Sequence, residues 1–284
     1  MRSPPEGAAV TLLSVEDLAV TFPTPRGPVR VVDGVSFALG RERLGIVGES
    51  GSGKSMTGRA ILRLIRPPGR VTGRLTFEGR DLCALTERQM RAVRGARISM
   101  VMQDPRFSLN PVMTVGAQVG EALRTHERVG RADLRARVRE ALASVRLDDP
   151  DRVARLYPHE VSGGMGQRVM IAMMLIPRPA LLIADEPTSA LDASVQGEVL
   201  RLMDGLVRER GMGLVLISHD LPLVARWCDR IVVMHAGRVV ETCAAADLHR
   251  ATHPYTRGLL AAVPRIGETR EALPVLDRTA WGGT

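Results

Sequence analysis

The sequence predicts an α/β protein, in which short buried strands lead into helices. Two observations predict this class. Largely apolar runs of four or five residues recur along the chain and end in polar residues, as buried strands do, at 44–47, 98–102, 180–184 and 214–217. Aromatic residues make up only 3% of the composition, which suits a helix-rich α/β protein better than a β-sandwich. With 284 residues, 45% of them hydrophobic, the chain can form one large domain with a smaller inserted or appended piece.

The residues after the first of these runs fit a phosphate-binding loop. They read Gly-Glu-Ser-Gly-Ser-Gly-Lys-Ser, which matches G-x-x-x-x-G-K-[ST], and helical periodicity follows at 56–65. Glycines let the backbone turn its N–H groups toward an anion at the N-terminus of that helix. We therefore expect a nucleoside triphosphate here, rather than a chance Gly/Ser turn. The residues expected to bind it are Gly48, Glu49, Ser50, Gly51, Ser52, Gly53, Lys54, Ser55 and Met56.

The composition singles out the lysine of this loop. Lys54 is the one lysine among the 39 Lys and Arg residues of the chain. An ammonium group is a compact point charge that fits between phosphate oxygens inside a closed loop, whereas a planar guanidinium is too wide to fit there. A lone lysine at this position therefore favours a direct phosphate contact.

The net charge raises nucleic acid as a partner, because the chain carries +8 at pH 7 and a pI near 10.6. The arginines are, however, spread along the whole chain and interleaved with acidic residues. The stretch 131–139, for example, has the pattern of a solvated helix face. We therefore expect no nucleic-acid partner.

The apolar segments and the cysteines indicate where in or outside the cell the chain is expected. Residues 1–7 contain no apolar signal-peptide core, and the longest apolar stretch, 169–176, is too short to span a bilayer. The cysteines, Cys83, Cys228 and Cys243, are odd in number and widely spaced, so they predict neither a disulfide framework nor a metal cluster. We expect a soluble chain that stays inside the cell.

The N-terminal region has the alternating pattern of strands. Apolar residues alternate over 12–22 and 29–39, which predicts two strands joined by a proline-rich loop at 23–28, and a further strand is predicted at 71–79. Phe22 ends the first strand. Its ring either stacks on the adenine of the nucleotide or belongs to the core.

Residues 106–160 change character, because helical periodicity replaces the strand pattern. Gln103 stands just before this segment, at the end of a buried strand, where it either contacts a metal-bound nucleotide or caps the strand. At the far end Ser162 is a suitable N-cap for an apolar helix, and Gly163 and Gly164 leave the N-terminus of that helix bare. This terminus could hold a second anion.

Two acids, Asp185 and Glu186, follow the buried strand 180–184, at the end of a strand where α/β proteins place their ligands. Two adjacent carboxylates at such a place are expected to act on the nucleotide, one by holding Mg²⁺ and the other by orienting and deprotonating water. His219 follows the last buried strand, 214–217. It is either structural or in contact with the γ-phosphate.

In this order and spacing, the motifs resemble the nucleotide-binding subunit of an ABC transporter, and the resemblance covers nearly the whole chain. It rests on five features, which are Gly48 to Ser55, Gln103, Ser162-Gly163-Gly164, Asp185-Glu186 and His219. It implies a P-loop NTPase core of ABC ATPase type, with an N-terminal antiparallel β-subdomain and an inserted α-helical subdomain. It also implies paired subunits that sandwich two ATP molecules, each bound by one subunit's phosphate loop and the other subunit's Ser-Gly-Gly motif.

The resemblance assigns roles to single residues and regions to the chain. It implies Mg²⁺ bound by Ser55, Gln103 and Asp185, a catalytic set of Lys54, Gln103, Glu186 and His219, and a further nucleotide contact from Asp192. The implied regions are 1–105 (β-subdomain and first part of the ATP-binding core), 106–177 (helical insert and signature helix), 178–243 (second part of the core) and 244–284 (C-terminal tail).

Leu44 to Ser55 and Val169 to Met173 resemble the first of the two ATPase subunits of the oligopeptide, dipeptide and nickel importers. Further segments resemble this importer group as a whole. They are Tyr157-Pro158-His159-Glu160, Met165 in place of the usual glutamine, and His253 to Leu260, while Val161 and Gly166 depart from the usual leucine and a larger residue. The implied function is ATP-driven uptake of peptides or of nickel or metal chelates. The implied partners are a second, related ATPase subunit, two membrane-spanning permease subunits and an extracytoplasmic binding protein. The chain would then be peripheral, on the cytoplasmic face of the inner membrane.

Two other functions remain as alternatives. A soluble ABC-type ATPase acting on nucleic acid or ribosomes would agree with the basic pI, but such relatives carry long coiled coils or two ATPase halves in one chain. An isolated phosphate-loop kinase would have neither the Ser-Gly-Gly motif nor the histidine at the strand end.

Overall fold

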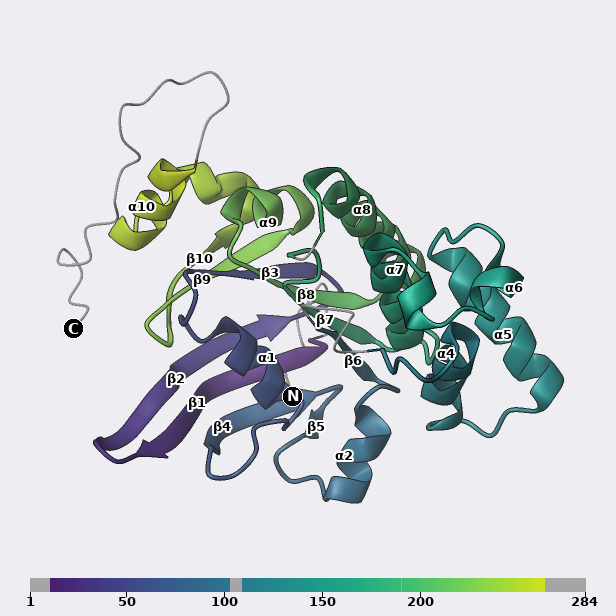
Figure 1. The fold of residues 1–284 in the computed structure, drawn as a ribbon. Helices are drawn as coiled ribbons and strands as arrows, with labels where there is room; N and C mark the ends of the chain where they lie inside the picture. Colours follow the sequence, from purple (N-terminus) through teal and green to yellow (C-terminus); the bar gives the residue numbers. More distant parts are fainter. Residues whose placement is uncertain (1–10, 103–108, 190, 264–284) are drawn as a thin grey trace, which may run out of the picture. The chain divides into compact units, whose positions relative to one another are not determined.

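The computed structural model describes residues 11–102, 109–189 and 191–263, without the side chains of Ala193 and Ser194. The chain forms two compact units, which are drawn together in Figure 1. Unit 1 comprises residues 1–84 and 218–284, and unit 2 comprises residues 85–217. The four regions expected from the sequence remain a prediction.

Unit 1 contains the predicted antiparallel sheet, with strand order β2-β1-β4-β5. Its strands are β1 (Leu13–Thr24), β2 (Gly27–Leu39), β4 (Arg70–Phe77) and β5 (Arg80–Asp81). Leu13 and Val15 point into the core, and the register then shifts before Leu18, around Asp17 with its left-handed backbone (φ 48°). This bulge keeps the apolar residues of β1 buried on both sides of the shift.

The proline-rich stretch 23–28 was predicted as a loop, and this prediction was wrong for most of it. The two strands continue to a tight turn at residues 25–26, with Pro23 opposite Pro28 and Thr24 opposite Gly27. The prolines are tolerated because they lie beyond the last pair that β1 forms with β4, between Thr21 and Arg70. At that end of the ladder, the N–H groups that proline lacks are not required.

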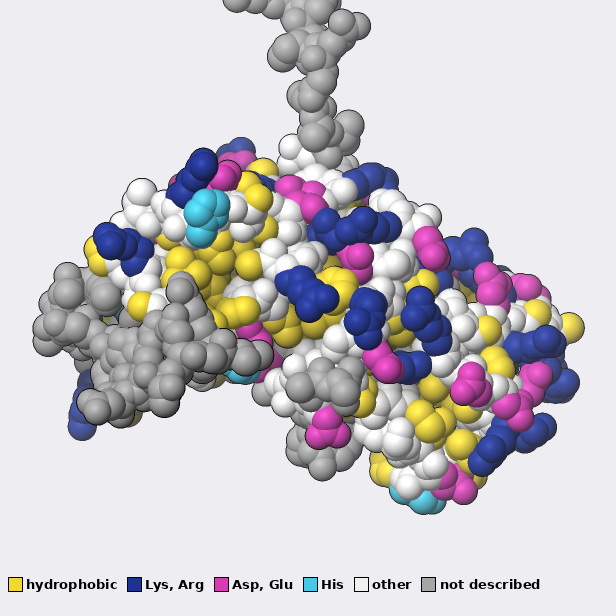
Figure 2. Space-filling model, turned by 90° about the horizontal axis from the view of Figure 1, so that it is seen from above, with side chains coloured by type: hydrophobic (Ala, Val, Ile, Leu, Met, Phe, Trp, Pro, Cys, Tyr) yellow, Lys and Arg dark blue, Asp and Glu magenta, His cyan; other side chains and the backbone are white. Residues whose placement is uncertain are grey.

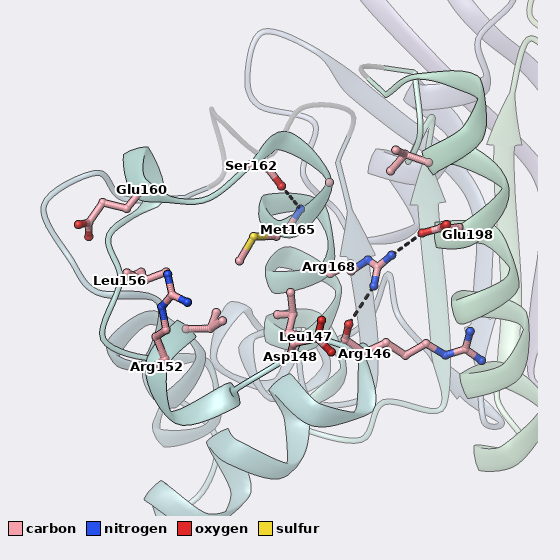
Figure 3. Close-up of a pocket in the computed structure, with 13 residues that line it drawn as sticks. Arg146, Leu147, Asp148, Arg152, Leu156, Glu160, Ser162, Met165, Arg168 and Glu198 are labelled. Atoms are coloured by element: carbon pink, nitrogen blue, oxygen red, sulfur yellow. Dashed lines mark hydrogen bonds and ion pairs between the residues drawn. The ribbon is translucent and has the colours of Figure 1, made fainter.

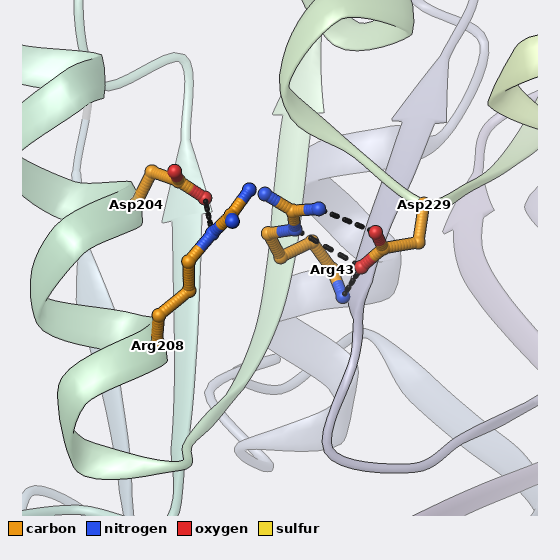
Figure 4. A network of polar contacts seen from close by, with 4 residues as sticks. All are labelled: Arg43, Asp204, Arg208 and Asp229. Carbon is orange, nitrogen blue, oxygen red and sulfur yellow. Dashed lines mark hydrogen bonds and ion pairs between the residues drawn. The ribbon is translucent and has the colours of Figure 1, made fainter.

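A second set of strands in unit 1 carries the phosphate loop. β3 (Arg43–Val47) runs parallel to β9 (Arg230–His235), and β9 turns back into β10 (Arg238–Ala244) as an antiparallel hairpin. The start of β3 is fastened to β9 because the Asp229 carboxylate accepts the backbone N–H of Arg43 (2.9 Å) and its Nε–H (3.0 Å). Figure 4 shows this pair, together with the separate Asp204–Arg208 pair of unit 2. The helices of unit 1 are α1 (Lys54–Ile61), α9 (Leu221–Trp227) and α10 (Pro254–Ala262), with a 3₁₀ turn, η2, at Ala245–Arg250.

Unit 2 is built on parallel strands in the order β8-β7-β6, at Gly213–Ser218, Leu181–Asp185 and Ile98–Val101. Every residue of β7 and β8 is buried, as expected of strands covered on both faces. Helix α2 (Glu87–Val93) leads into β6, and α8 (Ala193–Arg210) joins β7 to β8.

The described part of residues 106–177, which comprises the predicted helical segment and the apolar helix after it, contains helices and turns and no strand. Its elements are α4 (Val115–Arg124), α5 (Arg131–Ser144), α6 (Pro150–Val153), the 3₁₀ turn η1 (Pro158–Glu160) and α7 (Gly163–Leu175). Thr114 caps α4 and Ser162 caps α7, each through its hydroxyl. Among the described residues, no helix has both the length and the apolar character that a bilayer crossing needs.

Candidate functional site

The phosphate loop leaves β3 at Val47 and enters α1 at Lys54. The glycines at its two ends, Gly48 (φ 153°) and Gly53 (φ 97°), have backbone angles that other residues rarely adopt. They are also closely packed. A Cβ on Gly48 would lie 2.1 Å from the carbonyl oxygen of Met234, and one on Gly53 would lie 2.6 Å from that of Val31. Neither position can accept a side chain.

Lys54 points back into the loop from the first residue of α1. Its side chain is buried, and its Nζ donates to the carbonyl oxygens of Gly48 (2.7 Å) and Glu49 (2.8 Å). The first turn of α1 contains no acidic residue, and no side chain caps it. The loop therefore combines a buried ammonium with the positive end of a helix dipole, which is an environment that favours an anion.

Ser52 supplies an independent test of whether this loop fits a phosphate group. Its Oγ is buried and has no hydrogen-bond partner among the residues that the structure describes. A buried hydroxyl without a partner is costly unless something else accepts its proton. A phosphate oxygen would do so, and the residues present therefore fit the group that the motif predicts.

The other residues of the loop and of α1 differ in exposure. Ser50 and Gly51 are exposed, while Glu49, Ser55 and Met56 are half-buried. The outer side of the loop is bound to the C-terminal part of unit 1, because the N–H of Gly237 donates to the carbonyl of Ser52 (3.1 Å). The N–H of Glu49 donates to the hydroxyl of Tyr255 (2.9 Å). The sequence reasoning missed this last contact.

In unit 2 the two predicted carboxylates stand at the end of β7. Asp185 is the last residue of the strand and is buried, and Glu186 is half-buried. Glu186 has a left-handed backbone (φ 47°), which is uncommon for a residue with a side chain. Its N–H nevertheless continues the ladder by donating to the carbonyl of Ile217 (2.9 Å). Strained backbone of this kind concentrates at functional sites.

The turn after Glu186 is held from two helices. The buried side chain of Gln167, on α7, donates to the carbonyl of Pro187, and the side chain of Gln196, on α8, donates to that of Thr188 (2.9 Å). Asp192 lies just before α8 and is exposed, and its carboxylate makes no capping hydrogen bond to that helix. Helix α7 and the turn after Glu186 are thus joined directly within unit 2, through Gln167.

The Ser-Gly-Gly segment begins α7 as predicted, with the Ser162 hydroxyl accepting the N–H of Met165 (3.3 Å). Ser162 and Gly163 are exposed, and Gly164 is half-buried. Ser162 lines two hollows. One, of about 460 Å³, is bordered by α6, α7 and α8 (Figure 3), and the other, of about 380 Å³, is bordered by Pro158 and Val161 among others. The N-terminus of α7 therefore borders both hollows.

Arg168, on α7, lines the larger hollow. Arg168 donates to the carbonyl of Arg146 (2.9 Å) and to the carboxylate of Glu198 (2.7 Å), and Figure 3 shows both contacts. These contacts fasten the middle of α7 to the end of α5 and to α8. The exposed start of α7 consequently projects from a firmly held helix.

The remaining predicted residues are placed as follows. His219 is exposed and lies between β8 and α9, where the neighbouring Asp220 caps α9 by accepting the N–H of Leu223 (2.9 Å). Phe22 is half-buried at the end of β1, and its ring packs so closely on Gly69 that a Cβ there would lie 2.6 Å from it. Gln103 lies outside the described residues.

The described residues contain no group of three or more His, Cys, Asp or Glu side chains that could hold a metal ion. In nucleotide-binding proteins, Mg²⁺ is held by one or two protein ligands together with phosphate oxygens. The donor types predicted here, the Ser55 hydroxyl and the Asp185 carboxylate, are of the oxygen kind that Mg²⁺ requires.

Comparison with known proteins decides the family, because the family model described as ABC transporter matches residues 32–189. The chain belongs to the ABC transporter family. This ABC protein is 50% identical over 268 residues to a probable peptide ABC transporter ATP-binding protein of Sinorhizobium fredii, an alignment that covers 93% of the chain and 80% of the relative. It is 47% identical to the oligopeptide transport ATP-binding protein OppD of Escherichia coli, over 94% of the chain and 80% of the relative.

Solved structures agree on the fold of this ABC ATPase. The dimeric post-hydrolysis state of the ATP-binding cassette MJ0796, bound to ADP and Pi, matches with a TM-score of 0.73 and 28% identity, over 82% of this chain and 98% of that one. CbiO1 from Clostridium perfringens, part of an ABC transporter complex, matches with a TM-score of 0.73 and 26% identity, over 84% and 91%. The predicted fold class and ATP hydrolase activity are thus confirmed at the level of the family.

Proposed function

We propose that this chain is the ATP-hydrolysing subunit of an importer for peptides. The phosphate loop carries the proposal, since it presents a buried ammonium and a buried hydroxyl without a partner, between two glycines that cannot be replaced by larger residues. Peptide is the cargo that the names of the relatives support, in Sinorhizobium fredii, Escherichia coli and Bacillus subtilis. We therefore propose peptide uptake in preference to the nickel or metal-chelate uptake also considered from the sequence.

We assign the binding of the phosphates to the loop and to α1. The Lys54 ammonium would neutralise phosphate oxygens, the Ser52 hydroxyl would donate to one of them, and the N–H groups at the start of α1 would add the helix dipole. Phe22 would lie against the adenine. We assign Ser162, Gly163, Gly164 and Asp192 to the ATP held by the partner subunit, because Ser162 and Gly163 are exposed at the bare start of α7.

We assign the hydrolytic step to Glu186. A carboxylate in this strained turn would orient a water molecule and accept its proton as the water attacks the γ-phosphorus. His219 would contact the γ-phosphate. Mg²⁺ would be held by Ser55, Asp185 and Gln103, and when bound it neutralises negative charge on the phosphates. The proton transfer and the positioning of the water are the work of the protein's own side chains.

The proposed partners follow from the same assignment. A second, related ATPase subunit would complete the two ATP sites, two permease subunits would carry the peptide, and an extracytoplasmic binding protein would deliver it. The chain would then lie on the cytoplasmic face of the cell membrane, attached through the permeases. Its family relatives, which are ATP-binding proteins of peptide transport systems, support this arrangement.

Two substitutions in the full chain test the proposal, assayed with its partner subunits in reconstituted vesicles whose peptide uptake is measured. Lys54→Ala removes the charge that faces the phosphates, and we expect ATP affinity to fall at least about tenfold, since charge-assisted contacts are among the stronger polar interactions. Glu186→Gln keeps the shape and removes the base, so we expect ATP binding within about twofold of wild type and turnover reduced by about 10² or more.

Lys54→Arg is the matched control, because it keeps the charge and changes only the shape. We expect it to bind ATP poorly as well, since a guanidinium does not fit inside the loop. Unchanged ATP affinity in Lys54→Ala would contradict the assignment of the loop. ATP turnover without peptide uptake in the wild-type complex would contradict the assignment of the cargo.

A further inference from the structure

The residues proposed to bind ATP leave the stretch His253 to Leu260, near the end of the described chain, without a role. The structure places most of it in α10, and two residues of that helix, Tyr255 and Thr256, are buried in unit 1. Tyr255 is fully buried, with 1% of its surface exposed. Its hydroxyl accepts the N–H of Glu49, a residue of the phosphate loop 206 positions earlier (2.9 Å).

A single peptide plane connects this tyrosine with the functional lysine. The N–H that Tyr255 holds and the carbonyl of Gly48 belong to the same peptide bond, and that carbonyl accepts a hydrogen bond from Lys54 Nζ (2.7 Å). A trans peptide is rigid and directs its N–H and C=O in opposite directions. The Tyr255 hydroxyl and the Lys54 ammonium therefore bind opposite edges of the same peptide group.

The tyrosine itself is held in place from β9 and β10. Its ring lies against the ring of His235, at the end of β9, with centroids 4.3 Å apart. The Glu241 carboxylate, on β10, accepts the N–H of Thr252 (2.7 Å), its hydroxyl (3.2 Å) and the N–H of His253 (3.4 Å). His253 in turn caps α10 by accepting the N–H of Tyr255 (3.2 Å). The hydroxyl is thus presented to the loop by a fixed scaffold.

We propose that Tyr255 is a positioning residue for Lys54. By fixing the Gly48–Glu49 peptide, it holds the carbonyl that orients the ammonium and so keeps the loop in the shape that receives phosphate. This inference rests on the proposed function, because it assumes that Lys54 binds the phosphates. It gives α10 a defined task, which is to set the ATP affinity of the loop from outside it.

The test compares Tyr255→Phe with the wild-type full chain. The variant keeps the ring and removes only the hydroxyl, so we expect the fold to persist and the nucleotide-free melting temperature to change little. One hydrogen bond is lost, and we expect the Kd for ATP with Mg²⁺ to rise about three- to tenfold. With the partner subunits, KM for ATP should rise similarly while kcat stays within about twofold.

Hydrogen exchange of the Glu49 amide supplies a readout without nucleotide. Exchange at this amide should be faster in Tyr255→Phe and unchanged at loop amides that Tyr255 does not contact. Tyr157→Phe makes the same chemical change at an exposed tyrosine of unit 2 and should leave both Kd and Glu49 exchange as in wild type.

A lower melting temperature with unchanged Kd would assign the hydroxyl a structural role only and overturn the inference, as would unchanged exchange at Glu49. Lys54→Ala, measured in parallel, distinguishes a failure of the inference about Tyr255 from a failure of the proposed function of the loop. If Lys54→Ala loses ATP binding and Tyr255→Phe does not, only the inference about Tyr255 fails. If neither variant loses ATP binding, the proposed function of the loop fails as well.

Discussion

Gly53 shows how a single residue of the phosphate loop is determined by two separate requirements. Its φ of 97° is unfavourable for any residue with a Cβ, and a Cβ built there would lie 2.6 Å from the carbonyl oxygen of Val31. Gly79 meets only the first requirement, because its φ is 75° and nothing lies within 4 Å of a Cβ built on it. The two glycines therefore separate backbone strain from steric contact.

We predict that Gly53→Ala destabilises the protein considerably more than Gly79→Ala. The backbone strain alone costs about 1–2 kcal/mol at either glycine, and the contact with Val31 should bring the cost at Gly53 to about 3 kcal/mol or more. Chemical denaturation of the nucleotide-free chain measures both values. Equal losses of stability would mean that the loop moves away from Val31 at little cost, contrary to the packing described here.

At the level of residues, the sequence predicted the loop and its lysine because all residues of the motif follow one another in the chain. The Tyr255 contact could not be predicted in the same way. It joins residues 206 positions apart through a backbone N–H, which leaves no pattern in the sequence around Glu49. The only signal in the sequence was the segment His253 to Leu260. It indicated a resemblance to a family and did not indicate which residue Tyr255 contacts.

At the level of elements, periodicity predicted the buried strands and the helices well, since burial on both faces leaves an apolar run that is easily recognised. The error at 23–28 has a different origin. Prolines usually end a strand, but here two of them pair with each other beyond the edge of the neighbouring strand, where their missing N–H groups cost nothing. That circumstance depends on tertiary pairing, which local sequence does not report.

Helix α10 depends on an ionised carboxylate, and this leads to a pH-dependent prediction. Burial by itself raises the pKa of Glu241, but the hydrogen bonds it accepts, among them those from Thr252 and His253, outweigh burial and hold its pKa below the ordinary value. A carboxylate with a lowered folded-state pKa stabilises the fold fully above its unfolded-state pKa. This contribution declines as the pH falls and is lost as the pH passes below the folded-state pKa.

We therefore predict that Glu241→Gln lowers the melting temperature most at neutral pH, and that the difference from wild type shrinks on acidification. The amide retains an oxygen that accepts hydrogen bonds. The variant therefore measures the effect of removing the negative charge of Glu241, and not the loss of its hydrogen bonds. Melting curves of wild type and variant between pH 7 and pH 3 provide the measurement. A difference that stays constant over this range would show that the charge of Glu241 does not support α10.

At the level of the whole molecule, the excess of positive charge is distributed and partly paired. Figure 2 shows arginine side chains interspersed with acidic ones on one face. Several pairs are in direct contact within a unit, including Arg137–Glu127 (2.6 Å), Arg168–Glu198 (2.7 Å) and Arg230–Glu42 (2.7 Å). Ion pairs near the surface add little stability, but they weaken the local positive field that a nucleic-acid surface requires.

The exposed start of α7 and the dispersed charge together lead to a prediction about what stimulates the ATPase. Because the start of α7 is exposed and bare, we expect the chain alone to hydrolyse ATP slowly, and addition of the partner ATPase and reconstituted permeases to raise the rate at least about tenfold, as completion of a preorganised site would. DNA or RNA should leave the rate unchanged at physiological salt. Any binding of nucleic acid should be weak, with a Kd of about 10⁻⁶ M or higher, and should disappear as salt rises.

Steady-state ATPase rates measured with each addition decide between the importer and a nucleic-acid machine. Lys54→Ala in each mixture is the control for contaminating ATPases, because its residual rate sets the background. Stimulation by nucleic acid but not by permease vesicles would contradict the importer assignment while leaving the ATP site intact. Stimulation by the partner ATPase without permeases would instead indicate that completing the paired sites is sufficient, so that the permeases couple the cycle to transport without accelerating it.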